Sequence, residues 1–353
     1  MLGIVFPGDR ETALVTFPDP TPGPGEVIVE MKASGMCGSD LHLYRQPKGG
    51  TSVSAAMSKN TEDPATLIRG HEPCGIVAAV GAGVSERLAR VGQRVMVHHY
   101  WGCAVCGECR TGWTQLCENE APKMYGTNAH GSHAHYFKVP AQTILPLPDE
   151  LSFEAGAAIG CGSGTSYGAL KRLRMDGGGT IAVFGQGPVG LAGTQFAKAM
   201  GARVIALDIS DERLAMAKKF GADEIINPAK DDAVSALKDL THGRGTDAAL
   251  ETSGAVSARL EAIKGLKRWG TGAFVGIGAP TPIDINLDMI LRQVTIFGSV
   301  TFSAPWQEEC ARFAVDHKID VDGIFTHRWA LEQADEAYKL LDQQACGKGV
   351  FVM

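Results

Sequence analysis

The spacing of apolar residues divides the chain into two regions. Up to about residue 150, short apolar runs such as EVIVEMKASG (26–35) and GIVAAVG (75–81) are interrupted by Gly and Pro, which predicts a β-rich region. From about residue 151, runs of strand length alternate with segments of helical periodicity. Strands are predicted over 180–185, 203–208, 223–228, 247–254, 272–278 and 294–300, and helices over 188–201, 211–221, 233–243 and 258–270. This alternation predicts a parallel sheet with helices on both faces, and hence an α/β fold.

The length of the chain indicates more than one domain. Its 353 residues exceed the roughly 250–300 at which single hydrophobic cores stop growing. We therefore expect a β-rich domain over 1–150 and a parallel-sheet domain over 151–298. Residues 299–353 return to a mixed α and β pattern and end in the short strand GVFVM.

Composition narrows the classes of function. The net charge is −6 and there is no run of Lys or Arg, which argues against nucleic acid or an anionic membrane as partner. The first residues, MLGIVFPGDRETALV, lack the pattern of a signal peptide, and no apolar run reaches the ~18–20 residues of a membrane span. We expect a cytoplasmic protein, in which nine cysteines favour metal binding or catalysis over disulfides.

The sequence GQGPVG predicts a dinucleotide site, because it places Gly185, Gly187 and Gly190 between a predicted strand and a predicted helix. Without that context it would indicate only a tight turn. Asp208 ends the next strand, where a carboxylate accepts ribose hydroxyls and disfavours a 2′-phosphate, so NAD is expected rather than NADP. The alternative for Asp208 is a helix cap. Arg213 could reach the ribose, although its spacing fits a solvated helix charge better.

Four cysteines lie close together in CAVCGECRTGWTQLC. The spacing C-x2-C-x2-C-x7-C lets the thiolates of Cys103, Cys106, Cys109 and Cys117 converge on one tetrahedral ion, and zinc suits an all-sulfur site. Four ligands leave no open position, so this zinc would be structural. A redox-active thiol cluster is the less favoured alternative.

A second set of metal-ligand residues is dispersed along the chain. Cys37 lies in GMCGSDLH, His71 in GHEPCG and Cys161 in AAIGCGSG. Each alone could be an ordinary core residue. Together, two thiolates and one imidazole form a ligand set of catalytic zinc, with the fourth position left for water or substrate.

These motifs, taken together, resemble the zinc-dependent medium-chain alcohol dehydrogenases over essentially the whole chain. GHEPCGIVAAVGAGV (70–84) fits the zinc signature of that family, and CGSDLH, GCG, GQGPVG and GKGV follow in the family's order. The resemblance implies a GroES-like catalytic domain over 1–150 with both zinc sites. It further implies a Rossmann NAD-binding domain over 151–298 and a segment, 299–353, that returns to the catalytic domain.

By the same resemblance, zinc would bind at two places in each subunit. Cys37, His71 and Cys161 would hold the catalytic ion, with Glu72 as an alternate or neighbouring ligand, and the four clustered cysteines would hold the structural ion. Cys161 as third ligand favours simple alcohols over the polyol and threonine branches, which often use a Glu elsewhere.

The resemblance also implies roles outside the metal ligands. Ser39 would accept the proton of the substrate hydroxyl, and His42 would pass it toward solvent through the cofactor ribose. Arg213 would contact the adenosine ribose, and Lys348 would lie near the pyrophosphate. The segment VHHYWG matches a strand that lines the substrate pocket; because side chains alternate along a strand, at most one of its histidines faces the site, and we choose His99.

The implied function is hydride transfer between a small alcohol, secondary or primary, and NAD, giving a ketone or aldehyde. Alternatives are a polyol or threonine-type zinc dehydrogenase, a zinc-free quinone or enoyl reductase, which would lack both ligand sets, and a catalytically silent binding or redox-sensing relative. A homo-oligomer is expected, a tetramer in preference to a dimer. The segment 46–67 contains GGTSVSAAMSKNTEDPATL, which is expected to be an inserted surface loop.

Overall fold

The structure, a computed structural model, describes residues 1–49, 64–175 and 177–353. The described chain forms two compact units. The first contains residues 1–161, 302–316 and 321–353, and the second contains 162–301 and 317–320. Of the expected inserted loop 46–67, residues 50–63 lie outside the described residues, and Pro64–Thr66 form a short 3-10 turn, η1.

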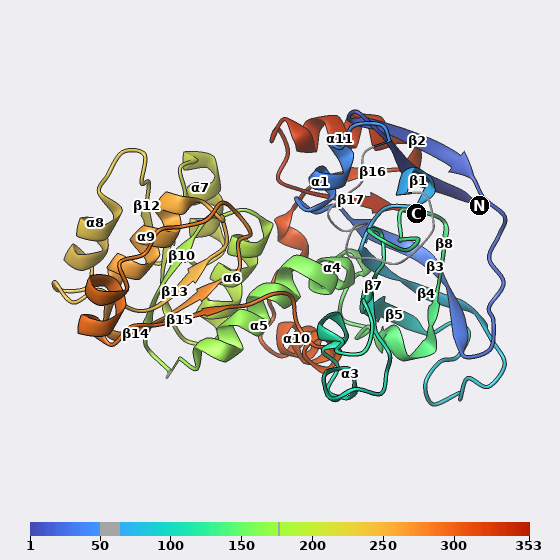
Figure 1. Cartoon of the computed structure of the whole chain (residues 1–353), viewed down its shortest axis with the longest axis horizontal. Coiled ribbons are helices and arrows are strands. Elements are labelled where there is room, and N and C mark those ends of the chain that lie inside the picture. The colour runs from blue at the N-terminus through green and yellow to red at the C-terminus, as the bar shows by residue number, and fades with distance from the viewer. Residues whose placement is uncertain (50–63, 176) are drawn as a thin grey trace. The chain divides into compact units, whose positions relative to one another are not determined.

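The first unit is built on a mainly antiparallel sheet (Figure 1). Its strand order in the described residues is β16 (Phe325–Trp329), β17 (Lys348–Val352), β3 (Glu26–Gly35), β4 (Glu72–Val80), β5 (Arg94–Val97) and β9 (Ile144–Pro146), and β8 (Tyr136–Pro140) also pairs with β3. The alternating apolar side chains of the central strands pack into one core, in which Val29, Val77 and Phe137 are buried. Val350 in β17 pairs with Gly35 in β3, so a late segment of the chain completes the sheet that carries the metal-ligand motifs.

The remaining elements of the first unit surround this sheet. A hairpin of β1 (Leu2–Gly8) and β2 (Glu11–Thr16) and a short pair of β6 (Tyr100–Trp101) and β7 (Lys123–Met124) lie outside it. The helices are α1 (Asp40–Tyr44), α3 (Gly107–Arg110), α4 (Phe153–Ala158), α10 (Ala304–Asp316) and α11 (Ala334–Asp342), and the shorter turns are η2 (Thr114–Leu116), η3 (Ala141–Thr143), η4 (Ile159–Ser163), η7 (Asp322–Ile324) and η8 (Leu331–Gln333).

The second unit is a parallel sheet with the order β12-β11-β10-β13-β14-β15. The strands are β10 (Thr180–Phe184), β11 (Arg203–Leu207), β12 (Glu224–Ile226), β13 (Thr246–Glu251), β14 (Leu266–Phe274) and β15 (Thr295–Gly298). The helices and turns are α5 (Gly164–Leu173), α6 (Pro188–Ala199), α7 (Asp211–Lys219), α8 (Ala233–Asp239), α9 (Val256–Gly265), η5 (Ile285–Met289) and η6 (Ile290–Arg292). Helices α6 and α7 pack against each other on one face of the sheet, and α8 and α9 pack against each other on the other (Figure 1). The predicted doubly wound α/β domain is confirmed.

One predicted boundary is wrong. The helical pattern over 258–270 ends at Gly265, and Leu266 already begins β14. Glycine is a poor helix former, and a Cβ on Gly265 would lie 2.6 Å from Cδ1 of Leu237, which would have to shift for a larger residue. Leu266 has extended backbone and is buried in the core of the sheet.

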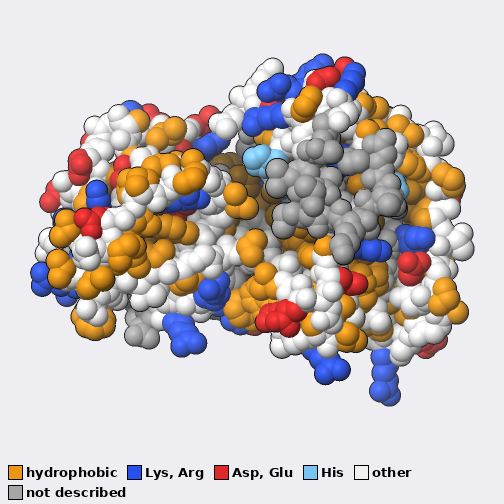
Figure 2. Space-filling model, viewed as in Figure 1, with side chains coloured by type: hydrophobic (Ala, Val, Ile, Leu, Met, Phe, Trp, Pro, Cys, Tyr) orange, Lys and Arg blue, Asp and Glu red, His pale blue; other side chains and the backbone are white. Residues whose placement is uncertain are grey.

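The described part of the chain has no helix that combines the length and the apolar character needed to cross a bilayer. On the face drawn in Figure 2, acidic and basic side chains are interspersed.

Candidate active site

The dispersed metal-ligand residues come together in the first unit. The ligand atoms of Cys37, His71, Glu72 and Cys161 all lie within 4.8 Å of one another. Sγ of Cys161 is 3.9 Å from Sγ of Cys37 and 3.6 Å from Nε2 of His71. Cys37 follows β3, His71 directly precedes β4 and Cys161 lies in η4, so sheet pairing and the π-helical segment after α4 bring the cluster together.

The two thiols of the cluster have opposite pKa shifts. The pKa of Cys37 lies well below its usual value, because Cys161 donates to it and His71 adds to this effect, while burial acts in the other direction. The hydrogen bond to Cys37 and burial raise the pKa of Cys161 well above its usual value. The pair thus favours one thiolate, and metal binding at such a site requires release of the remaining proton. Two sulfurs and one imidazole nitrogen at these separations fit the donor set of zinc.

Asp40 fixes the orientation of His71, and the sequence analysis missed it. Its Oδ1 lies 2.9 Å from Nδ1 of His71, and its Oδ2 accepts the backbone N–H of Cys37 at 2.9 Å. Nε2 of His71 faces the thiols, so the proton on Nδ1 is donated to Asp40. A metal-binding histidine commonly donates its second ring nitrogen to a carboxylate. The Asp between Ser39 and Leu41 in CGSDLH is the signal that could have found this partner.

Other predicted residues lie beside the cluster. Oγ of Ser39 is 3.4 Å from Nε2 of His71, and His42 is exposed on α1. His99 is buried, with its ring centre 5.2 Å from that of His71 and its Nδ1 3.0 Å from the carbonyl oxygen of Gly160. The neighbouring His98 is bonded instead to Gln307 at 3.2 Å. Burial, together with the charges of the two neighbouring imidazoles, lowers the pKa of His99 well below its usual value, so its ring is neutral.

The structure gives Lys348 a different partner from the one expected. Its ammonium donates to both carboxylate oxygens of Glu72, at 2.5 Å to Oε1, and to the carbonyl oxygen of Met36 at 2.8 Å. Both side chains are almost fully buried. Burial raises the pKa of Glu72 to about 7, although Lys348 acts to lower it. Because this ammonium is occupied, we replace the expected pyrophosphate contact with a role beside Glu72.

The clustered cysteines form a second group of ligand atoms within 4.8 Å: Cys103, Cys106, Cys109 and Cys117. Backbone N–H groups point at the sulfurs: Cys106 N lies 3.3 Å from Sγ of Cys103, and Cys109 N lies 3.5 Å from Sγ of Cys106. Such N–H groups stabilise thiolates, and those of Val105 and Cys106 lower the pKa of Cys103. All four donors of this group are sulfurs, and their mutual distances are compatible with binding one zinc ion.

The glycine motif turns from β10 into α6 in the second unit. Gly185 has φ +84°, in the left-handed region, and a Cβ on Gly190 would collide with the carbonyl of Gly185. At Gly187, by contrast, a Cβ would meet no atom within 4 Å in the described structure. Asp208 is buried at the end of β11 and accepts the N–H of Gln186 at 2.6 Å, which ties it to this turn.

Asp208 has two further neighbours. Its Oδ1 accepts the N–H of Ser210 at 2.9 Å, and a guanidinium nitrogen of Arg213 lies 4.0 Å from its Oδ2. Arg213 is thus on the same side of the turn as the carboxylate.

Comparison with known proteins agrees with both units. The family model "Alcohol dehydrogenase GroES-like domain" matches residues 23–149, and "Zinc-binding dehydrogenase" matches residues 188–316. The zinc-type alcohol dehydrogenase-like protein YphC of Escherichia coli (strain K12) is 38% identical over 99% of this chain and 98% of its own. The chain belongs to the zinc-dependent medium-chain alcohol dehydrogenase family.

Two further members of this family extend the comparison. The sorbitol dehydrogenase of Bacillus subtilis (strain 168) is 33% identical over 96% of this chain and 92% of its own. The solved structure of the alcohol dehydrogenase TADH from Thermus sp. ATN1 superimposes with a TM-score of 0.87 at 28% identity, covering 100% of this chain and 99% of that one. The expected family, fold and family-level activity on alcohols are confirmed.

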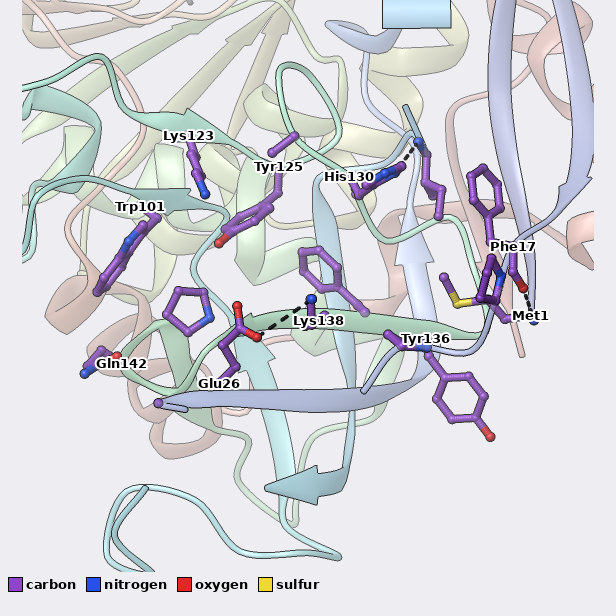
Figure 3. Close-up of a pocket in the computed structure, with 18 of the residues that line it drawn as sticks. Met1, Phe17, Glu26, Trp101, Lys123, Tyr125, His130, Tyr136, Lys138 and Gln142 are labelled. Atoms are coloured by element: carbon purple, nitrogen blue, oxygen red, sulfur yellow. Dashed lines mark hydrogen bonds and ion pairs between the residues drawn. The ribbon is translucent and has the colours of Figure 1, made fainter. Parts of the chain in front are cut away.

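This zinc-dependent dehydrogenase has a further pocket in its first unit, with a volume of about 750 Å³ (Figure 3). Its walls carry the aromatic side chains of Phe17, Trp101 and Tyr125. Lys138 and Glu26 form an ion pair at 3.8 Å within it. Among the described lining residues there is no member of either cysteine-containing cluster, so this pocket is separate from both.

Proposed function

We propose that this protein oxidises a small alcohol to a ketone or aldehyde with NAD, and reduces the carbonyl compound in the reverse direction. The observation that carries the proposal is the convergence of Cys37, His71 and Cys161 from three separate segments, with the hydroxyl of Ser39 beside His71. Membership of a family of alcohol dehydrogenases supports it.

The roles of the residues follow from their chemistry. Cys37, His71 and Cys161 would hold catalytic zinc, with Glu72, neutralised by Lys348, as an alternate ligand. When bound, the zinc supplies a Lewis acid that lowers the pKa of an alcohol, and NAD supplies the hydride acceptor. The four clustered cysteines would hold a second, structural zinc in each subunit.

The chain's own residues carry the proton. The exposed hydroxyl of Ser39 accepts the proton of the substrate hydroxyl and passes it on, and His42, exposed three residues later, delivers it toward solvent. Asp40 holds His71 in the tautomer that presents Nε2 to the site.

NAD is proposed in preference to NADP. Gly185, Gly187 and Gly190 would cradle the pyrophosphate at the start of α6, where free N–H groups favour an anion. Asp208 would accept the ribose hydroxyls, and its buried carboxylate opposes a 2′-phosphate. Arg213 would contact the adenosine ribose from the same side.

A polyol is the second candidate substrate, and His99 favours it over a threonine-type substrate. The Gly160 carbonyl holds the ring proton on Nδ1, which leaves Nε2 of a neutral imidazole as a hydrogen-bond acceptor beside His71. An acceptor there suits a hydroxyl on the carbon next to the reacting one, and cannot pair with a carboxylate. A sorbitol dehydrogenase and L-threonine 3-dehydrogenases are equally similar to this chain, at 33% identity, so the preference rests on His99.

A homo-oligomer is proposed as the assembled form, with a tetramer preferred to a dimer. Strand β15 is at the edge of its sheet in the described chain, and the segment before it exposes more than half of several apolar side chains: Ile277, Ile285, Leu287, Ile290 and Leu291. Apolar side chains are frequent on the drawn face of this unit (Figure 2). An apolar surface next to an unpaired strand edge favours association with a second copy.

The test is a panel of primary alcohols, secondary alcohols, polyols and hydroxy amino acids, each assayed with NAD and with NADP while zinc content is measured. Turnover of an alcohol or polyol with NAD is expected. If zinc is bound and no compound is turned over, the dehydrogenase function is wrong. Cys161→Ser should abolish activity together with one zinc equivalent per subunit, and retained activity would assign the third ligand elsewhere.

A further inference from the structure

A line of buried polar side chains continues from Asp40 into the core of the first unit. We propose that His133 and Tyr338 are positioning residues, which hold Asp40, and through it the metal ligand His71, by a hydrogen-bonded chain that begins at Ser132. The proposal rests on the proposed catalytic zinc site, because it assigns His71 as a metal ligand.

The chain is continuous and sealed from solvent. Its members Ser132, Ser34, His133 and Tyr338 are fully buried, and Asp40 is 2% exposed. Oγ of Ser34 lies 2.7 Å from Oγ of Ser132 and 2.7 Å from Nδ1 of His133. Oη of Tyr338 lies 2.8 Å from Nε2 of His133 and 3.4 Å from Oδ2 of Asp40. The last link joins Oδ1 of Asp40 to Nδ1 of His71 at 2.9 Å.

Only one order of protons satisfies every link. A carboxylate can only accept, so Tyr338 donates its hydroxyl proton to Asp40. The phenol oxygen then accepts from Nε2–H of His133, which leaves Nδ1 of that ring as an acceptor. Ser34 donates to this nitrogen and in turn accepts from Ser132. Every hydrogen bond in the chain is therefore donated in the direction of Asp40. Asp40 also accepts from Nδ1–H of His71 and from the backbone N–H of Cys37.

This order requires His133 to be neutral with its proton on Nε2. Burial lowers the pKa of His133 to about 4, which agrees with a neutral ring throughout the physiological range. Since these side chains are buried, removal of one member leaves its partners unpaired, and a buried unpaired polar group costs about 1–3 kcal/mol.

Backbone contacts tie His133 to the segment that carries His71. The N–H of His133 donates to the carbonyl of Arg69 at 2.8 Å, and the N–H of Ser132 donates to that of Gly70 at 3.0 Å. Gly70 has φ +89°, and a Cβ there would lie 2.6 Å from Cγ of His133. The glycine that precedes the metal ligand is therefore needed because the ring of His133 lies against it.

The test compares Tyr338→Phe with Tyr44→Phe in the full-length protein. Both tyrosines are buried, and their ring centres lie 5.4 Å apart in one aromatic cluster, but Tyr44 is not part of the chain. Competition with a chelator measures zinc affinity. The zinc equivalent that every variant retains belongs to the four-cysteine site, and the equivalent whose affinity changes belongs to the catalytic site. Loss of the partner that holds Asp40 should weaken zinc binding about tenfold in Tyr338→Phe, the lower end of the effect of mutating residues behind a metal ligand. Tyr44→Phe should remain within twofold of the wild type.

A second measurement reads the protonation of His133 in the wild-type protein, and a variant serves only to assign the signal. In the wild-type protein labelled with ¹⁵N-histidine, the ring nitrogens of His133 should show a protonated Nε2 and an unprotonated Nδ1, unchanged between pH 6 and pH 8. Assignment uses the signal lost in His133→Gln. That variant keeps an N–H donor for Tyr338 and should retain zinc better than His133→Leu.

The outcomes separate the two proposals. A His133 protonated on Nδ1, or equal zinc affinity in the two Tyr→Phe variants, would overturn the positioning role. Failure of the wild-type protein to bind zinc at Cys37, His71 and Cys161 would instead overturn the proposed function.

Discussion

Gly187 offers a direct test of the dinucleotide site. The space around this residue does not require glycine, because its φ is −69° and a Cβ would meet no described atom within 4 Å. Its position as N-cap of α6 favours glycine over alanine only modestly. If a pyrophosphate lies against the turn, Gly187→Ala should lose no more than about 1 kcal/mol of stability and should weaken cofactor binding.

The size of the binding effect follows from the contact that is lost. A methyl group at residue 187 would move a phosphate off one backbone N–H of the turn, and a hydrogen bond to a charged group contributes about 1.5–3 kcal/mol. That corresponds to about 10- to 150-fold weaker binding of NADH. Fluorescence titration with NADH measures the affinity, and thermal unfolding without cofactor measures the stability.

Gly190→Ala is the matched control, because the two glycines share a motif but differ in their surroundings. A Cβ on Gly190 would lie 2.8 Å from the carbonyl carbon of Gly185 and 3.0 Å from Oγ1 of Thr252. This variant should lose about 1–3 kcal/mol of stability in the absence of any cofactor, as overpacked sites do. If Gly187→Ala binds NADH as tightly as the wild type, the pyrophosphate does not lie over this turn and the assignment is refuted.

Three further variants test the remaining assignments. Asp208→Asn keeps an acceptor for the turn but removes the charge. The ratio of kcat/KM with NAD to kcat/KM with NADP should then fall at least about tenfold, which is a loss of about 1.4 kcal/mol in discrimination between the cofactors. An unchanged ratio would contradict the role of Asp208. Lys348→Met leaves Glu72 without its cation and should cost about 3–5 kcal/mol in urea unfolding at pH values where Glu72 is ionised in the wild type. Lys348 acts to lower the folded pKa of Glu72, so without it that pKa lies above the wild-type value of about 7. Below that value Glu72 is protonated in both proteins, so the deficit should be small at pH 6 and grow as pH rises above 7, and a constant deficit would argue against this role. Cys106→Ser should remove one zinc equivalent and lower the unfolding temperature, whereas Cys161→Ser removes the other equivalent and the activity; loss of both equivalents in either variant would mean that the two sites are not independent.

Much of this architecture could be predicted from the sequence, because it depends on local patterns. The alternation of strands and helices after residue 151 predicts the parallel sheet, and GQGPVG lies at the turn into α6 as expected. The end of α9 was missed, because the helical pattern continues in the sequence, whereas Leu266 pairs with Thr246 of β13, which is a tertiary contact.

The candidate metal ligands could be predicted from the sequence, but the buried residues that hydrogen-bond to them and their neighbours could not. Cys37, His71 and Cys161 were found through motifs, and their partners were not. Tyr338 lies 298 residues from Asp40 along the chain, and Lys348 lies 276 residues from Glu72. No spacing rule connects such pairs, because sheet pairing of β17 with β3 and the packing of α11 bring them together. Only Asp40, within CGSDLH, carried a local signal.

The position of β17 beside β3 has a consequence for the nascent chain. At a synthesis rate of about 5–20 residues per second, Lys348 leaves the ribosome about 14–55 s after Glu72, from which it is separated by 276 residues. During that interval the second unit can fold and Glu72 can pair with Gly35 of β3, but Glu72 lacks its cation and β3 lacks its neighbour β17. The proposed ligands Cys37, His71 and Cys161 are therefore all made before the second unit, whereas the buried ion pair beside them forms only after it.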